Sequence, residues 1–332
     1  MIGLDIGSYY IKLCSAERRG DSVNVSIALM ARNAISPVGG KHDNEVAAIV
    51  SKLARKANIS HNNAAFTVSS HDVVSRNFEF PKMTHEELKG AVQLEVSQAS
   101  SLKSANMYSD FVVLANSALQ DVLYVAAPKD EIESRLQIVR KAGFAPTACD
   151  IGSLALTNCF WAFDPNPAKE SVVLLDIGHT CSNISIVDNE ELRFVRSIDC
   201  GGRDITREIS NHLGISTDLA ETIKRKPEIW KGLGLNMTNI LKKSLPDMLE
   251  GVYRSVEYCM TRKKLPFVDK ILLTGGSSSL LGIDDFITES LGFSTKKWNP
   301  LTLTDSNVAA YRQWGQFLSV ALGLALRNTA GL

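Results

Sequence analysis

The stretch Ile2-Gly3-Leu4-Asp5-Ile6-Gly7-Ser8-Tyr9-Tyr10-Ile11-Lys12-Leu13 opens the chain and decides the fold. It predicts a short apolar strand, a glycine turn with a carboxylate and a hydroxyl, and a returning strand that carries a lysine. The same pattern recurs at 172–187, where Asp176-Ile177-Gly178 follows an apolar run. Two copies of one hairpin indicate an α/β chain built as two related halves that face a common ligand.

The composition is that of an ordinary globular protein whose 332 residues have room for two domains. The chain has 36 basic and 36 acidic residues, so its charge gives no reason to expect nucleic acid or an anionic membrane as a partner. We expect no signal peptide and find no apolar run of about 18 residues. The six cysteines contain no C-x-x-C pair, which favours free thiols in a cytoplasmic protein. Because the histidines also lack ligand spacing, we expect no metal site built from side chains alone.

Strand and helix patterns alternate over 64–147 and predict a compact insert in the first half. A third Asp-Ile-Gly-Ser follows at 150–153, but the next residues have a helical pattern. We therefore interpret it as a helix start in which Asp150 or Ser153 is the cap. Residues 164–170 contain two prolines and predict a linker between the halves. In the second half we expect helices at 203–213, 218–226 and 237–264, the last kinked at Pro246.

The two aspartates are the strongest candidates for chemistry. A carboxylate at the end of a buried strand is desolvated unless a cation lies beside it. Glycine and hydroxyl turns offer backbone N–H groups to anions, so Asp5 and Asp176 suit a complex of Mg²⁺ with phosphate, to which Lys12 would add a positive charge. The alternative is that each aspartate only stabilises its own turn through a hydrogen bond.

Two further motifs are weaker by themselves. Gly275-Gly276-Ser277 follows a buried strand and lets a base or phosphate approach the backbone, although it lacks the spacing of a P-loop or a dinucleotide-binding fingerprint. Glu221 and Lys224 lie on one helix face, where an exposed ion pair is the simpler interpretation.

The order of these motifs resembles the actin/Hsp70/sugar-kinase nucleotide-binding fold over nearly the whole chain. Within it, the sequence most resembles the PilM family of type IV pilus assembly, relatives of the division protein FtsA. That closer resemblance lies in the insert, at Phe80-Pro81-Lys82-Met83, 122–129 and 141–146. It implies a duplicated actin/Hsp70-like fold with an inserted subdomain of the FtsA/PilM type. The implied subdomains are 1–63 with 148–165 (1A), 64–147 (1C), 166–214 with 267–332 (2A), and a mainly helical 215–266 (2B).

The resemblance also implies roles for individual residues around ATP or ADP. Asp5 and Asp176 would bind Mg²⁺, through water, and the closing helix, 316–327, would form part of the hinge. The residues implied to contact the phosphates are Gly7, Ser8, Lys12, Gly178 and Thr180. Those implied to line the ribose and adenosine are Gly202, Glu221, Lys224, Gly275, Gly276 and Ser277.

Three departures from the actin pattern bear on catalysis. Where actin has a glutamine that orders the attacking water, the matching region reads Asp150-Ile151-Gly152-Ser153. Bulky Tyr9-Tyr10 occupy the first phosphate turn, and His179 stands where a small residue is usual in the second. Because water positioning supplies much of phosphoryl-transfer catalysis, we expect nucleotide binding with slow or absent hydrolysis.

The function implied by the resemblance is a cytoplasmic ATP-binding scaffold that binds the N-terminal cytoplasmic peptide of a PilN-like inner-membrane protein. It would reach the membrane only through that partner, and self-association stays open. One alternative is an FtsA-like division protein, although the chain shows no room after Arg327 for that family's membrane-targeting helix. The other is a small-molecule kinase, for which we find no motif that would supply the catalytic base.

Overall fold

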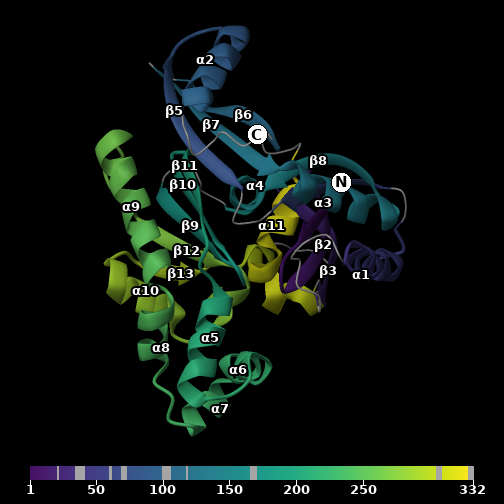
Figure 1. Cartoon of the computed structure of the whole chain (residues 1–332), viewed down its shortest axis with the longest axis vertical. Coiled ribbons are helices and arrows are strands. Elements are labelled where there is room, and N and C mark those ends of the chain that lie inside the picture. Colours follow the sequence, from purple (N-terminus) through teal and green to yellow (C-terminus); the bar gives the residue numbers. More distant parts are fainter. Residues whose placement is uncertain are drawn as a thin grey trace.

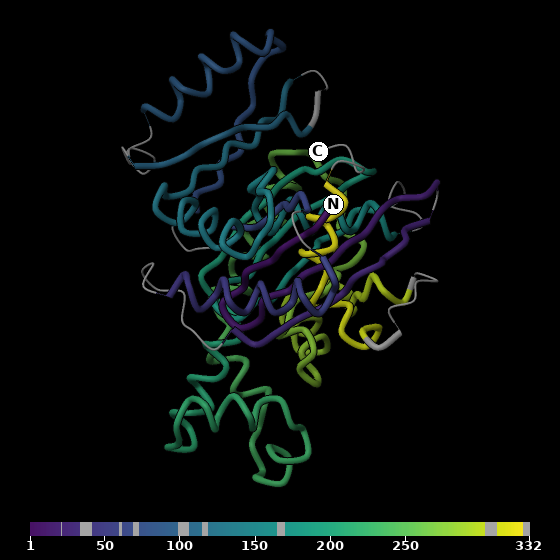
Figure 2. Tube along the Cα trace, turned by 90° about the vertical axis from the view of Figure 1, so that its right-hand side faces the viewer, coloured from purple at the N-terminus to yellow at the C-terminus, as the bar shows by residue number. Residues whose placement is uncertain are grey.

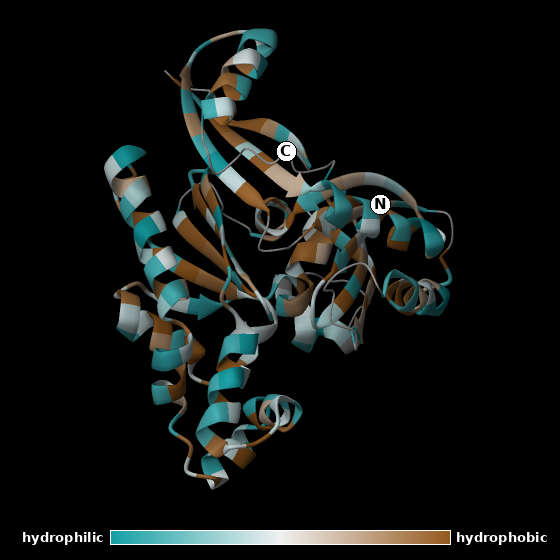
Figure 3. Ribbon diagram, viewed as in Figure 1, coloured by the Kyte–Doolittle hydropathy of each residue, from teal (hydrophilic) through white to brown (hydrophobic). Residues whose placement is uncertain are grey.

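The computed structural model describes residues 1–20, 22–33, 42–59, 62–68, 73–98, 106–116, 119–164, 170–303 and 309–327. Two halves lie side by side, with a small sheet above them and a group of helices below (Figure 1). In a view turned by 90°, this small sheet and the group of helices lie at opposite ends of the molecule (Figure 2). Apolar residues fill the strands of the large sheets, whereas polar residues dominate the outer helices (Figure 3). Residues 165–169 of the expected linker lie outside the described residues.

The two large sheets have the same strand order, which confirms that the chain consists of two related halves. In each, an antiparallel hairpin continues into a third strand on one side, and two parallel strands follow on the other. The first sheet, in the order β3-β2-β1-β4-β8, comprises β1 (Ile2–Ile6), β2 (Tyr10–Arg19), β3 (Ser22–Arg32), β4 (Asn63–Val68) and β8 (Ala145–Ile151). The second, in the order β11-β10-β9-β12-β13, comprises β9 (Ser171–Ile177), β10 (Ser182–Asp188), β11 (Glu191–Ile198), β12 (Lys270–Thr274) and β13 (Thr295–Lys297).

The insert has its own three-stranded sheet in the order β5-β7-β6, formed by β5 (Val74–Pro81), β6 (Met107–Asn116) and β7 (Leu119–Pro128). Helix α2 (His85–Gln98) packs Leu88 and Val92 on this sheet. The expected 64–147 insert also includes residues 64–68 and 145–147. These residues lie in β4 and β8, which pair within the first sheet. Helix α3 (Lys129–Lys141) likewise packs beside α1 (Asp43–Lys56) on that sheet.

A buried ion-pair cluster joins the insert to the second half. The side chain of Lys263 is only 2% exposed, and its Nζ lies 2.7 Å from both Glu79 of β5 and Asp121 of β7. Apolar residues of β7 and β11, such as Leu123 and Val195, share one core in the same region. The insert, although it branches from the first half, is therefore packed on the second.

The second half carries helices below and beside its sheet (Figure 1). Those below are α5 (Gly202–Leu213), α6 (Thr217–Lys224), α7 (Pro227–Gly232) and α8 (Met237–Ser244), whereas α9 (Pro246–Arg262) and α10 (Ile283–Leu291) lie beside the sheet. The sequence pattern at 237–264 predicted one kinked helix, but the structure has two, α8 and α9, because Pro246 starts a new helix. Within the described residues, we find no helix that is both long enough and apolar enough to cross a membrane.

Two central helices cross between the halves. Helix α4 (Gly152–Phe163) leaves the first sheet and packs on the second, and α11 (Gly315–Ala325) leaves the second and packs on β1 and β2. Their crossing depends on glycine, since a Cβ on Gly323 would lie 1.6 Å from the carbonyl oxygen of Ala155. The prediction that a helix follows the third Asp-Ile-Gly is confirmed. The predicted cap is wrong, because no side chain caps the first turn of α4. Asp150 instead accepts hydrogen bonds from the Ile151 N–H and the Arg327 Nε.

Candidate functional site

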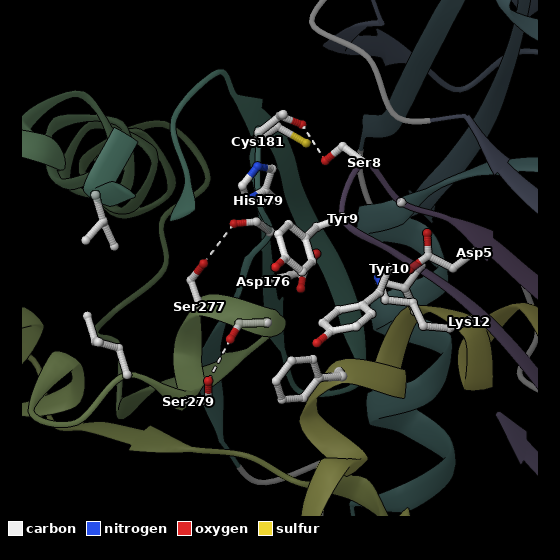
Figure 4. A pocket seen from close by; sticks show the side chains of 18 of the residues that line it. Asp5, Ser8, Tyr9, Tyr10, Lys12, Asp176, His179, Cys181, Ser277 and Ser279 are labelled. Carbon is white, nitrogen blue, oxygen red and sulfur yellow. Dashed lines mark hydrogen bonds and ion pairs between the residues drawn. The ribbon is translucent and has the colours of Figure 1, made fainter. Parts of the chain in front are cut away.

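A cavity of about 420 Å³ lies where the turns of the two halves meet. Figure 4 shows side chains from both halves pointing into it. Gly202 and Gly275 lie just behind its wall, where a Cβ would approach Ser277 and Asp176 respectively. The other predicted site residues line the cavity: Asp5, Gly7, Ser8, Lys12, Asp176, Gly178, Thr180, Glu221, Lys224, Gly276 and Ser277. The structure thus brings all the predicted residues together at one place.

The two glycine turns have the same local geometry. The Gly7 N–H donates to the carbonyl of Tyr10 at 3.1 Å, and the Gly178 N–H donates to the carbonyl of Cys181 at 3.0 Å. A Cβ on either glycine would lie within 2.7 Å of the same carbonyl oxygen, so neither turn accommodates a side chain there. The turns face each other closely, since Ser8 Oγ lies 3.1 Å from Thr180 Oγ1. Hydroxyls and turn backbones of both halves therefore converge on one side of the cavity.

The first carboxylate has a cation beside it. Lys12 Nζ lies 2.7 Å from Asp5 Oδ2, and Thr67 donates to Oδ1 at 3.2 Å. This pairing follows from the hairpin, because Asp5 and Lys12 lie opposite each other on β1 and β2. Burial acts to lower the pKa of Lys12, but the neighbouring Asp5 and Asp176 outweigh it, so the pKa is raised and the ammonium stays charged.

The second carboxylate has an amide in the equivalent position. Asp176 and Asn183 lie opposite each other on β9 and β10, and Asn183 Nδ2 donates to Asp176 Oδ2 at 3.2 Å. Burial raises the pKa of Asp176, and Lys12 and the amide offset this only in part. A buried carboxylate without a full ion pair is a favourable place for a cation.

The carboxylates of the cavity suit a magnesium ion that keeps part of its water shell. Among the described residues, we find no cluster of three or more acidic, histidine or cysteine side chains that would enclose a metal. Mg²⁺ with a nucleotide does not need one, because it keeps several waters and uses one or two carboxylates together with phosphate oxygens. Asp176 and Asp5 provide such carboxylates on the two strands that enter the cavity. The donor set therefore fits a hydrated Mg²⁺ held with phosphate.

A polar network borders the cavity on the helical side. Lys224 Nζ donates to Glu221 Oε2 at 2.7 Å, to Thr206 Oγ1 at 2.9 Å and to the carbonyl of Gly202 at 2.9 Å. Thr206 also donates to Glu221. Burial acts to raise the pKa of Glu221, but Lys224 outweighs it and the pKa is lowered, whereas burial lowers the pKa of Lys224. Glu221 and Lys224 are both less than 10% exposed, so they are not the exposed ion pair of the simpler interpretation.

The glycine-serine turn after β12 completes the wall. Gly275 has φ +88°, and a Cβ there would lie 2.3 Å from Asp176 Oδ1, so this turn depends on glycine. Ser277 donates to the carbonyl of Gly178 at 3.0 Å, which connects this turn to the second Asp-Ile-Gly turn. On its far side, Gly276 lies against Phe317 of α11. The cavity is thus polar at the hairpin turns and apolar toward α11.

Sequence reasoning missed several lining residues. Asn183 was detectable, because it follows Asp176 by the same seven positions that separate Lys12 from Asp5. The aromatic and cationic residues at the rim gave no such signal, since they come from separate elements: Arg225, Trp314 and Phe317.

The three departures from the actin pattern also lie at the cavity. Tyr9 packs beside His179, with ring centroids 4.9 Å apart. Burial, followed by the charge of Lys224, lowers the pKa of His179 to about 4, so its imidazole is neutral at pH 7. Of the region 150–153, only Gly152 is part of the wall, and the described lining residues include no glutamine.

Known proteins resemble this chain in fold and in part of its sequence. A PilM chain, solved as a PilM–PilN type IV pilus biogenesis complex, has a TM-score of 0.85 at 21% identity, covering 99% of this chain and 98% of that one. EutJ from Carboxydothermus hydrogenoformans has a TM-score of 0.60 at 14% identity, covering 98% of this chain and 88% of that one. MreB5 of Spiroplasma citri bound to ADP has a TM-score of 0.53 at 11% identity, covering 97% of this chain and 94% of that one. These likenesses establish the actin-like fold that the motif order implied.

Sequence relatives include the cell division protein FtsA from two organisms. The Enterococcus faecalis protein is 27% identical over 192 residues, 52% of this chain and 43% of that protein. The Bacillus subtilis protein is 30% identical over 102 residues, 31% and 23% respectively. The matched part is less than half of either relative. A family model described as type IV pilus assembly protein PilM, in contrast, matches residues 3–329. The chain therefore belongs to the PilM family of type IV pilus assembly proteins.

Proposed function

We propose that the chain binds ATP or ADP with Mg²⁺ in the cavity between its halves. One observation carries this proposal: two Asp-Ile-Gly turns, 171 positions apart in sequence, face one cavity with Ser8 and Thr180 only 3.1 Å apart. A triphosphate is long and highly charged, so it needs N–H and hydroxyl donors from both sides. MreB5, which shares the fold, was solved with ADP bound.

Each predicted residue has a role that its contacts allow. Gly7, Ser8, Gly178 and Thr180 would donate to phosphate oxygens, and Lys12 would place its charge among them. Asp5 and Asp176 would hold the hydrated metal, which when bound supplies positive charge to the phosphates. Gly202, Glu221 and Lys224 would contact the ribose, and the turn at 275–277 would contact the base.

Calorimetric titration with ATP tests this proposal. We expect binding that depends on Mg²⁺ and is lost in Asp176→Asn, which keeps the side-chain shape but removes the charge. As a matched control, Asp284→Asn changes a partly exposed carboxylate of α10 that pairs with Lys297 and does not line the cavity. Absence of heat and of thermal stabilisation with wild-type protein and ATP–Mg²⁺ would refute the proposal.

We also propose that ATP turnover is slow or absent. The departures described above leave the described wall without a glutamine to orient the attacking water. Neutral His179, in the second turn and packed against Tyr9, donates at most one hydrogen bond and has no charge to stabilise the transition state. Phosphate release from purified protein with saturating ATP measures this directly. A steady rate above about 1 s⁻¹, typical of competent phosphoryl-transfer enzymes, would contradict it.

As a scaffold, the chain would bind the N-terminal cytoplasmic peptide of a PilN-like inner-membrane protein, in the region where the insert meets the first half. The support is family membership and the fold match to a chain solved in a PilM–PilN complex. This would place the protein in the cytoplasm, beside the membrane through its partner. Fluorescence anisotropy of a labelled peptide from the PilN-like partner, with and without ATP, tests it against a scrambled peptide. Equal binding of both peptides would exclude specific recognition.

A further inference from the structure

Arg225 makes a contact across the cavity that the nucleotide roles above leave unexplained. It follows the last residue of α6, in the second half, yet its Nη1 donates to the hydroxyl of Tyr10, at the start of β2, at 2.8 Å. Its guanidinium also lies 4.3 Å from the ring centroid of Tyr9 and 5.4 Å from that of Tyr10. We call this set of Arg225, Tyr9 and Tyr10 the cross-cavity contact.

The contact is firmly supported on both sides. On the helical side, Arg225 Nε donates to Glu221 Oε1 at 2.8 Å, while the other oxygen of Glu221 binds Lys224. On the other side, Tyr9 packs beside His179 at 4.9 Å. Tyr10 packs edge-on against Phe317 at 5.9 Å. Figure 4 shows the two tyrosine rings side by side within the cavity.

All three residues line the cavity, and the Arg225 side chain is still 40% exposed. They therefore form a part of the wall that separates the cavity from solvent. Because the tyrosines belong to the first half and Arg225 to the second, any motion that moves the first turn away from α6 breaks the contact. A planar guanidinium is well suited to this, since it stacks on two rings and still donates to a hydroxyl and a carboxylate.

We propose that Arg225 is a further residue of the nucleotide site, which retains bound nucleotide by closing the wall against Tyr9 and Tyr10. This inference rests on the proposed nucleotide binding. Arg225 acts on retention more than on recognition, because its bonds to Glu221 and Tyr10 and its stacking on the Tyr9 ring hold its guanidinium in the wall. Breaking the contact should speed both entry and release, so release rates change more than affinity.

Release of radiolabelled ATP, chased with excess unlabelled ATP in the presence of Mg²⁺, measures this. We expect Arg225→Gln to release ATP about tenfold faster, equivalent to about 1.4 kcal/mol. Tyr10→Phe removes only the hydroxyl and should release ATP about fivefold faster, as expected for the loss of one typical hydrogen bond. Arg225→Lys keeps a charge near Glu221 but not the planar stacking, so its rate should fall between wild type and Arg225→Gln.

A matched control and a double variant make the test specific. Arg254→Gln removes an exposed i,i+4 pair with Glu250 on α9, away from the cavity, and should release ATP at the wild-type rate. In the double variant, Tyr10→Phe should add little to the release rate of Arg225→Gln, because both substitutions remove the same hydrogen bond. Unchanged release in Arg225→Gln, or fully additive effects, would overturn the inference while wild-type binding stands. If the wild type binds no ATP, the proposed function fails and this inference with it.

Discussion

Replacing Gly323 by alanine tests the crossing of the two central helices. A Cβ there would lie 1.6 Å from Ala155 O and 2.5 Å from its carbonyl carbon, whereas ordinary contacts begin at 3.4 Å. Helices α4 and α11 would have to separate by about 1.8 Å, which is more than a core usually absorbs. Helix α11 has little freedom to move, because Gly3 of β1 packs directly on the backbone of Ala321 and Ala325.

We expect Gly323→Ala to lower the free energy of unfolding by about 3 kcal/mol, at the upper end of overpacking costs. The matched control is Gly90→Ala, in the interior of α2, where a Cβ would meet no atom within 4 Å. Alanine should raise stability there by up to about 1 kcal/mol through its helix propensity. Urea unfolding followed by far-UV circular dichroism gives both values. If the free energy of unfolding of Gly323→Ala lies within about 0.5 kcal/mol of the wild-type value, the two helices do not cross as closely as described.

Three further predictions concern single residues. Lys263→Met should destabilise the protein by about 3 kcal/mol in the same urea assay, because it leaves two carboxylates of the insert without their buried cation. Asp176→Asn should raise the melting temperature of ligand-free protein at pH 7.5 but not at pH 3. Burial raises the pKa of Asp176 above its ordinary value of 3.8, so the ionised carboxylate destabilises the folded state. This destabilisation grows as the pH rises through the folded-state pKa and is complete above it. Equal effects at the two pH values would contradict this. Gly202→Ala places a Cβ 2.3 Å from Ser277 Oγ and should weaken ATP binding about tenfold in calorimetry, whereas Gly232→Ala, which meets no atom within 4 Å, should not.

The two related halves could be predicted from the sequence because the pattern that marks each of them is local. Each hairpin consists of an apolar run, Asp-Ile-Gly and a returning strand, and the structure builds two sheets of one topology from them. The cavity followed from the same signal, since a turn after a buried strand must lie at the edge of its sheet.

Features that depend on distant partners were not predictable in this way. The pairing of β4 with β8 within the first sheet is one such feature, because a pairing over some 80 residues leaves no local pattern. Arg225 was missed although its neighbour Lys224 was found, because its partner Tyr10 is 215 positions away. The Asp150 cap was wrong because Arg327, near the other end of the chain, binds that carboxylate instead.

The unequal partners of the two aspartates have a consequence for how a ligand lies. A perfectly duplicated frame would present the same surface from either half and accept an elongated molecule in two orientations. Here the first half has an ammonium, Lys12, where the second has a neutral amide, Asn183. Together with the polar network around Glu221 and Lys224 on one side only, this difference gives the cavity a direction, so an elongated anion should bind in it in one orientation.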